Sequence, residues 1–133
     1  MTDAPLKILV ADDDPVIGDT FRHILTGLGH TCDITHDGKD CLKQIAQQHY
    51  DILFLDLIMP KLDGEAVLQA LRGREPQMSI VVISSEDDED VIRDILRRGA
   101  TAFIVKPVTL EAVESVIKEV VAKRAASGDA NRA

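Results

Sequence analysis

The feature that most constrains the fold of this chain is a fivefold alternation of two kinds of segment. Short apolar runs suited to β-strands alternate with longer stretches in which apolar residues recur every three or four positions, as on one face of a helix. The expected strands are Leu6–Ala11, Thr31–Thr35, Asp51–Leu55, Ser79–Ile83 and Thr101–Val105. Strands that are apolar throughout and alternate with helices predict an α/β fold, in which helices cover both faces of a parallel sheet.

The helical stretches carry their own start and stop signals. Asp14 and Pro15 suit the cap and first position of the first helix. Further expected caps are Asp37 and Asp63, and the fifth helix is expected after Thr109. Gly29 and Gly99 close the first and fourth helices. The acidic run 86–90 is interpreted as the first turn of the fourth helix, where the helix dipole favours negative charge.

Few topologies suit five such units, because the crossover connections are right-handed. The leading prediction is a flavodoxin-like, doubly wound, five-stranded parallel sheet of order 2-1-3-4-5, with five helices. In this order the chain reverses between the first and third strands, and ligands collect at the carboxyl ends of the strands there. We expect residues 1–124 to form one domain and the small, polar segment 125–133 to be a disordered tail.

Composition limits the classes of function. Hydrophobic residues make up 45% of the 133 residues, which is enough for a core, and the net charge is −8. Such a charge argues against direct binding of nucleic acid or of an anionic membrane surface. No apolar run reaches the roughly 20 residues of a membrane span. With two cysteines, no disulfide framework and no secretory signal at the N-terminus, we expect a cytoplasmic protein.

Polar residues follow four of the five expected strands at the end where ligands bind. Asp12 and Asp13 follow the first strand, Asp56 the third, Ser84 the fourth and Lys106 the fifth. The proposed order makes the first and third strands neighbours, and likewise the third and fourth, and the fourth and fifth. We therefore expect the three aspartates to converge, with Ser84 and Lys106 beside them.

Three carboxylates in one cleft repel one another unless a cation lies among them or their pKa values rise. Mg²⁺ prefers oxygen ligands and commonly takes one or two carboxylates while keeping several waters. Lys106 offers a second positive charge. A carboxylate beside Mg²⁺, a hydroxyl and a lysine is suited to accept a phosphoryl group, with the aspartate as nucleophile.

The complete set resembles the receiver domain of bacterial two-component response regulators. The matching residues are Asp12-Asp13, Asp56 with Met59-Pro60 and Asp63-Gly64, Ser84, and Lys106-Pro107. They occur in the family's order and spacing, and the resemblance covers residues 6 to 124. Each element alone is a weak signal, whereas the set is highly specific.

The resemblance implies a role for each residue. Asp56 would be phosphorylated by a sensor histidine kinase or a phosphotransfer protein. Mg²⁺ would be bound directly by Asp13, Asp56 and the backbone carbonyl of Ile58, and by Asp12 through a water. Ser84 and Lys106 would contact the phosphoryl group, and Ser84 and Phe103 would form the switch. The Lys106–Pro107 peptide bond would be cis.

The resemblance also implies a signalling switch rather than an enzyme, with Mg²⁺-dependent self-phosphorylation and self-dephosphorylation. The fourth helix, fifth strand and fifth helix would present a surface to a downstream protein target. A phosphorylation-dependent homodimer stays open. The sequence equally leaves open whether the chain acts alone or is one domain of a longer protein.

Several alternatives remain. Phe103 fits a plain core residue as well as a switch. A flavodoxin-like cofactor binder shares the strand order, but the acidic run 12–14 would repel a phosphate. A dehalogenase-type phosphatase needs a second aspartate two residues after the nucleophile, where this chain has Ile58. A receiver-shaped module that is never phosphorylated is the last alternative, and the intact set of site residues argues against it.

Overall fold

The structure is a computed structural model that describes residues 5–57, 63–72 and 77–131, without the side chains of 126–131. Its elements are β1 (Lys7–Ala11), α1 (Pro15–Gly27), β2 (Thr31–Thr35), α2 (Gly38–Gln47), β3 (Ile52–Asp56), α3 (Gly64–Leu71), β4 (Ser79–Ser84), α4 (Glu89–Arg97), β5 (Ala102–Val105) and α5 (Leu110–Asn131). Each strand begins and ends within one residue of its predicted bounds. The α/β class and the alternation of elements are confirmed.

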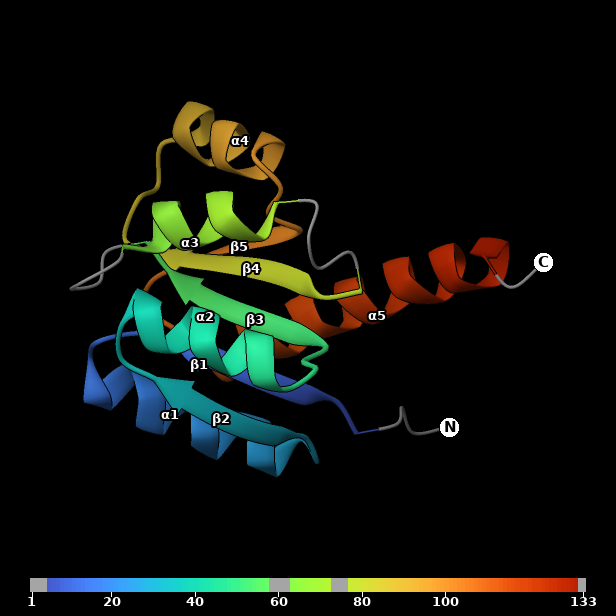
Figure 1. Cartoon of the computed structure of the whole chain (residues 1–133), viewed down its shortest axis with the longest axis horizontal. Helices are drawn as coiled ribbons and strands as arrows, with labels where there is room; N and C mark the ends of the chain where they lie inside the picture. Colours follow the sequence, from blue (N-terminus) through green and yellow to red (C-terminus); the bar gives the residue numbers. More distant parts are fainter. Residues whose placement is uncertain (1–4, 58–62, 73–76, 132–133) are drawn as a thin grey trace.

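The five strands form one parallel sheet of order β2-β1-β3-β4-β5 (Figure 1), which confirms the predicted flavodoxin-like topology. In the ladder, Ala11 of β1 lies opposite Leu55 of β3, and Asp56 lies opposite Ile83 of β4. The residues that follow β1, β3 and β4 therefore emerge together at the end of the sheet where the strands finish, which we call the carboxyl edge.

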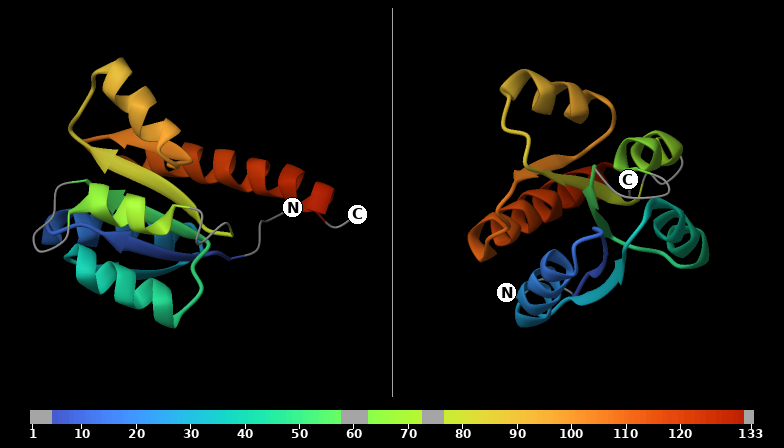
Figure 2. Two further views of the ribbon diagram at one scale, coloured as in Figure 1. Left: turned by 45° about the horizontal axis from the view of Figure 1, so that its top comes forward. Right: turned by 90° about the vertical axis from the view of Figure 1, so that its left-hand side faces the viewer.

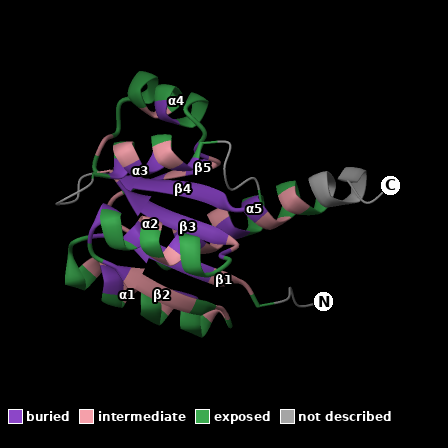
Figure 3. Cartoon of the chain, in the orientation of Figure 1, coloured by how far each residue is buried: buried purple, intermediate pink, exposed green. Residues whose placement is uncertain are grey.

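Helices cover both faces of the sheet (Figure 2). On one face, Phe21 of α1 and Val113 of α5 belong to the same apolar cluster. On the other face, Cys41 of α2, Val67 of α3 and Ile95 of α4 belong to a second cluster. The central strands between the clusters are buried along their length (Figure 3), as expected for a parallel sheet covered on both sides.

Helices α1 to α4 begin where aspartate side chains accept backbone N–H groups of the first turn, and before α5 the Thr109 hydroxyl accepts the N–H of Ala112 at 3.1 Å. The cap bonds join Asp14 to Val16 (2.9 Å), Asp37 to Asp40 (2.8 Å), Asp63 to Ala66 (2.9 Å) and Asp88 to Asp90 (2.8 Å). Gly29 and Gly99, which follow α1 and α4, have φ of 90° and 118°, the left-handed region that favours glycine.

The acidic run before α4 serves more than one purpose. Asp88 is the N-cap, and only Glu89 and Asp90 lie in the first turn. Glu86 and Asp87 precede the helix and line a cleft at the carboxyl edge. The prediction that the whole run belongs to the first turn was therefore right for two of its five residues.

The longest helix, α5, continues to Asn131 and so enters the segment 125–133 for which we predicted disorder. That segment's side chains beyond residue 125 are outside the described part, and the disordered tail stays a prediction. Over the described residues, no helix, α5 included, is apolar for long enough to span a bilayer.

The end of the sheet where the strands begin, which we call the amino edge, holds a separate group of polar residues. Arg124 of α5 places Nη2 3.2 Å from Oδ1 of Asp51, the residue before β3. Next to it, the buried Tyr50 donates its hydroxyl to Oδ2 of Asp33 at 2.7 Å. These contacts lie at the end of the sheet opposite the predicted functional residues.

Candidate functional site

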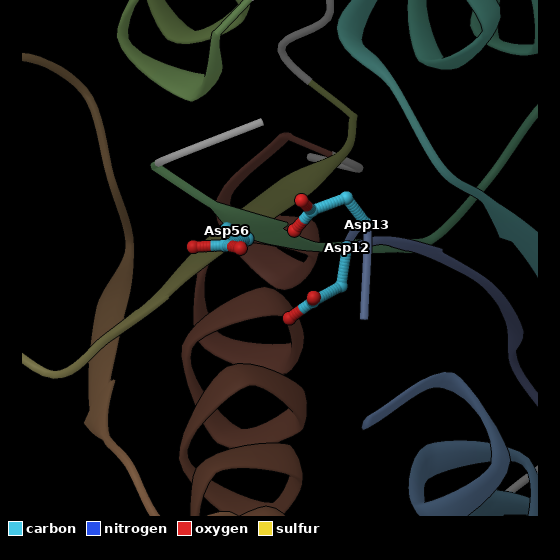
Figure 4. A group of neighbouring side chains, drawn as sticks. All are labelled: Asp12, Asp13 and Asp56. Carbon is cyan, nitrogen blue, oxygen red and sulfur yellow. The ribbon is translucent and has the colours of Figure 1, made fainter. Parts of the chain in front are cut away.

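Three carboxylates meet at the carboxyl edge of the sheet (Figure 4). Each of Asp12, Asp13 and Asp56 offers an oxygen, and these atoms lie within 4.8 Å of one another. Asp12 and Asp13 follow β1 directly, and Asp56 is the last residue of the neighbouring β3. Adjacent parallel strands thus bring together residues that are 43 or more positions apart in the chain, as the strand order predicts.

Asp12 is completely buried. Its Oδ1 accepts the backbone N–H of Asp14 at 2.9 Å, whereas its buried Oδ2 accepts no hydrogen bond from any described residue and has Lys106 Nζ at 3.5 Å. Burial raises the pKa of Asp12, and this effect outweighs the N–H of Asp14 and the charge of Lys106, which both lower it. Nearby Asp13 raises the same pKa further. The ionised carboxylate is therefore poorly compensated by the protein itself.

Lys106 places its ammonium group beside the cluster. Its Nζ lies 3.5 Å from Oδ2 of Asp12 and 3.7 Å from Oδ2 of Asp56. Its backbone N–H donates to the carbonyl of Ser84 at 2.8 Å, which fixes the end of β5 beside that of β4. The bond from Lys106 to Pro107 is cis, as the resemblance implied. One lysine thus faces two of the three carboxylates.

Ser84 is the last residue of β4 and is buried beside the carboxylates. Its hydroxyl oxygen accepts the backbone N–H of Glu86 at 3.2 Å. Ser84 lines a cleft of about 640 Å³ together with Asp13, Asp14, Asp56, Ser85, Glu86, Asp87 and Lys106. The predicted acceptor, hydroxyl and lysine therefore face one solvent-accessible space.

The cluster fits a hard divalent cation. All three metal-ligand candidates are carboxylates, which Mg²⁺ prefers, and within the described part of the chain the buried Oδ2 of Asp12 accepts no hydrogen bond. An added cation would offset both the repulsion among the carboxylates and the cost of burying them. The fourth predicted ligand, the carbonyl of Ile58, lies outside the described residues, as do Met59 and Pro60.

Phe103 lies on β5 and is half-buried. Its ring packs against the apolar cluster beneath α2, α3 and α4 and does not line the cleft. This position is compatible with a core residue and with a residue that changes its exposure, so the switch role of Phe103 stays a prediction.

His36 was not among the residues predicted for the site, although it lies at the same edge of the sheet. The side chain is exposed, yet its Nδ1 lies 3.1 Å from the backbone carbonyl of Asp12. His36 directly follows β2, and the backbone N–H of Asp12 donates to the carbonyl of Thr35 at 3.1 Å. Its place one residue beyond a strand end, at the ligand-binding edge, was the available signal.

Known proteins of similar sequence belong to the family that the residues of this site resemble. The family model for the response regulator receiver domain matches residues 8–118. The response regulator MprA of Mycobacterium tuberculosis is 36% identical over 106 residues, which are 80% of this chain and 46% of MprA. The chain spans about half the length of the curated relatives it matches.

Solved structures show the same fold. The Francisella response regulator 1452 receiver domain superposes with a TM-score of 0.83 at 26% identity, covering 89% of this chain and 98% of that one. NtrX from Brucella abortus superposes with a TM-score of 0.89 at 27% identity, covering 97% of this chain and 29% of NtrX. The match to part of a longer chain shows that such a domain also occurs joined to others.

Proposed function

The chain belongs to the family of response regulator receiver domains of two-component systems, and from that premise we propose that it accepts a phosphoryl group on Asp56. The donor is the phosphohistidine of a sensor histidine kinase or of a phosphotransfer protein. The observation that best supports the proposal is the position of Asp56. Its carboxylate lines the cleft, 3.7 Å from Lys106 and within 4.8 Å of two other carboxylates.

In the proposed reaction an oxygen of Asp56 attacks phosphorus, and the bond between phosphorus and the donor imidazole nitrogen breaks. The electron pair of that bond returns to the imidazole, which takes a proton, and Asp56 becomes an aspartyl phosphate. Lys106 is placed to donate from Nζ to a phosphoryl oxygen, and the Ser84 hydroxyl is a second donor in the same cleft.

Asp13 and Asp56 would hold Mg²⁺ directly, with Asp12 acting through a water and the carbonyl of Ile58 completing the protein ligands. When bound, Mg²⁺ supplies positive charge that stabilises the transferring phosphoryl oxygens. Asp12 and Asp13 contribute by keeping the cation beside the acceptor. Buried Asp12 contributes further by holding Lys106 at the rim of the cluster.

The proposed output surface consists of α4, β5 and α5. Among the described residues, five large apolar side chains are exposed, and four of them lie in these elements or at their ends: Val91, Leu96, Val105 and Leu110. Exposed apolar groups gathered on neighbouring elements are typical of a protein-binding surface. We propose that a downstream protein reads this surface in the cytoplasm, that Ser84 and Phe103 couple it to Asp56, and that no nucleic acid or membrane binds directly.

The phosphoacceptor is tested by incubation with acetyl phosphate and Mg²⁺, followed by intact mass measurement. We expect one added phosphoryl group on the wild type, and none on Asp56→Asn or in EDTA. Asp14→Asn is the matched control, because it removes a carboxylate from the same cleft while keeping a good helix cap, and it should be labelled like the wild type. Label that persists in Asp56→Asn contradicts the proposal.

The output surface is tested with beryllofluoride, which mimics a phosphoryl group on the aspartate. Capture of partner proteins on immobilised wild type should increase with the mimic, and Val105→Asp should abolish the increase without changing labelling of Asp56. Light scattering on the same samples separates a monomer from a phosphorylation-dependent homodimer. Equal capture with and without the mimic contradicts a switch at this surface.

A further inference from the structure

We propose that Gly64 positions the phosphoacceptor, because only a residue without a side chain lets α3 begin against the backbone that follows Asp56. The inference rests on the proposed role of Asp56 and adds a positioning residue to it. A Cβ atom at residue 64 would lie 2.1 Å from the carbonyl oxygen of Asp56 and 2.5 Å from the Cα of Leu57. Both are backbone atoms, so no side-chain rotation relieves the overlap.

The need for glycine here concerns space and not backbone conformation. Gly64 is the first residue of α3, and its φ is outside the left-handed region occupied by Gly29 and Gly99. Glycine is less favourable than alanine in a helix, so a glycine at this place calls for a compensating reason. Its backbone N–H donates to the carbonyl of Leu57 at 3.0 Å, which joins the start of α3 to the end of β3.

A side chain at residue 64 would displace the phosphoacceptor Asp56 rather than helix α3. Val67 is fully buried and Leu68 and Leu71 are nearly so, and a retreat of α3 would leave a cavity beneath them. The ladder of β3 is weaker at its end, because pairing with β1 stops at Leu55 and only β4 still pairs with Asp56. We therefore expect the peptide between Asp56 and Leu57, at the end of the strand, to move before the buried side chains of α3 do.

The displacement matters because the partners of Asp56 are on other strands. Ordinary contact begins at 3.4 Å, so a Cβ atom 2.1 Å from the Asp56 carbonyl oxygen requires the peptide to move by at least about 1.3 Å. Asp12, Asp13 and Lys106 do not move with it, since they follow β1 and β5. Misplacement of a reacting group by about 1 Å can reduce a rate about 100-fold. Gly64 therefore keeps the Asp56 carboxylate in position beside the side chains that follow β1 and β5.

The test compares Gly64→Ala with Gly27→Ala, whose Cβ meets nothing within 4 Å. Folding is checked by circular dichroism, labelling by acetyl phosphate at saturating Mg²⁺, and Mg²⁺ affinity by titration of amide chemical shifts. We expect Gly64→Ala to label about 10- to 100-fold more slowly per folded molecule and to bind Mg²⁺ more weakly, with Gly27→Ala unchanged. A lower thermal midpoint with wild-type labelling and Mg²⁺ affinity would overturn the inference.

Two further variants decide the matter if Gly64→Ala does not fold. Asp63→Ala adds no atoms and removes the acceptor of the Ala66 N–H, which frees the same helix start. We expect it to label severalfold more slowly, and Asp63→Asn, which keeps an acceptor oxygen, to restore the rate. Unchanged labelling in folded Asp63→Ala overturns the inference. A wild type that takes up no phosphate refutes the proposed function instead, and the Mg²⁺ titrations still decide the role of Gly64.

Discussion

The two edges of the sheet differ in how far nearby donors and cations compensate the charge of their aspartates. At the carboxyl edge, Asp12 and Asp56 share Lys106 at 3.5 and 3.7 Å, with Asp13 beside them. At the amino edge, the carboxylate of Asp51 accepts the backbone N–H of residue 7 at 2.8 Å and a guanidinium N–H of Arg124 at 3.2 Å. Among the described residues, two carboxylates at the carboxyl edge share one lysine, whereas the Asp51 carboxylate at the amino edge has several donors of its own.

The pKa values follow the same contrast. Burial raises the pKa of Asp12, and the neighbouring hydrogen bond and lysine do not compensate. Burial also acts to raise the pKa of Asp51, but the N–H of Lys7, Arg124 and His49 together bring it below its usual value. The contacts at the amino edge therefore join β1, β3 and α5, whereas the carboxylates at the carboxyl edge have the chemistry of a cation site.

The largest expected effect on stability comes from removing the carboxylate of Asp51, the hydrogen-bond acceptor at the amino edge. Asp51→Ala leaves the partly buried N–H of Lys7 and the Arg124 guanidinium without their shared carboxylate. We expect the free energy of unfolding to fall by about 2 kcal/mol, measured by urea denaturation followed by far-ultraviolet circular dichroism. Asp51→Asn, which keeps one acceptor oxygen, should lose less. A loss within error of zero for Asp51→Ala would remove the contrast between the edges.

At the carboxyl edge, removing a carboxylate is expected to raise the free energy of unfolding rather than lower it. Asp12→Asn removes a buried charge near two other carboxylates and keeps an oxygen for the N–H of Asp14. In EDTA we expect the free energy of unfolding to rise by about 1 kcal/mol. Added Mg²⁺ should stabilise the wild type more than the variant and so narrow the difference. Exposed Asp14→Asn is the control, and a destabilised Asp12→Asn would contradict our interpretation of the cluster.

Changing pH should make both differences vanish at the acid end, for opposite reasons. The folded pKa of Asp51 is lowered, so its stabilisation is present above the unfolded value of about 3.9 and is lost as pH falls through the folded pKa. The folded pKa of Asp12 is raised, so stability is lost as pH rises from about 3.9 through the folded pKa.

Measured against the wild type in EDTA from pH 3 to 7, Asp51→Asn should therefore become progressively less stable and Asp12→Asn progressively more stable. The two difference curves should diverge from a common origin by up to about 2 kcal/mol at neutral pH. Parallel curves, or curves that open in the same direction, would show that the two edges do not differ in the proposed way.

The smallest effect is expected for Arg124→Met. Its guanidinium is one-third exposed, and exposed ion pairs contribute little. We expect a loss of about 0.5 kcal/mol in the free energy of unfolding, reduced further in 0.5 M salt. A double-mutant cycle with Asp51→Asn isolates the pair, and additive losses would show that Arg124 and Asp51 are not coupled.

Much of the site followed from sequence because strand order and strand ends decide it. Asp12 and Asp56 end neighbouring parallel strands, so their convergence required only the topology. The caps at Asp14, Asp37 and Asp63 were equally local signals. The contact of Arg124 with Asp51 was not predictable, since it spans 73 positions and depends on how far α5 extends along the sheet. For Gly64, the sequence showed only its place in the Asp63-Gly64 motif, whereas the structure gives a steric reason.

The location of Tyr50 has a consequence for how this protein can be observed. The chain has one tyrosine and no tryptophan, so Tyr50 is the natural source of near-ultraviolet emission. Its ring is buried at the amino edge, with its hydroxyl on Asp33 and the Lys7 ammonium 5.4 Å from its centroid. Intrinsic fluorescence therefore reports on the end of the sheet remote from Asp56. A change in that emission on phosphorylation would mean that the signal travels the whole length of the strands.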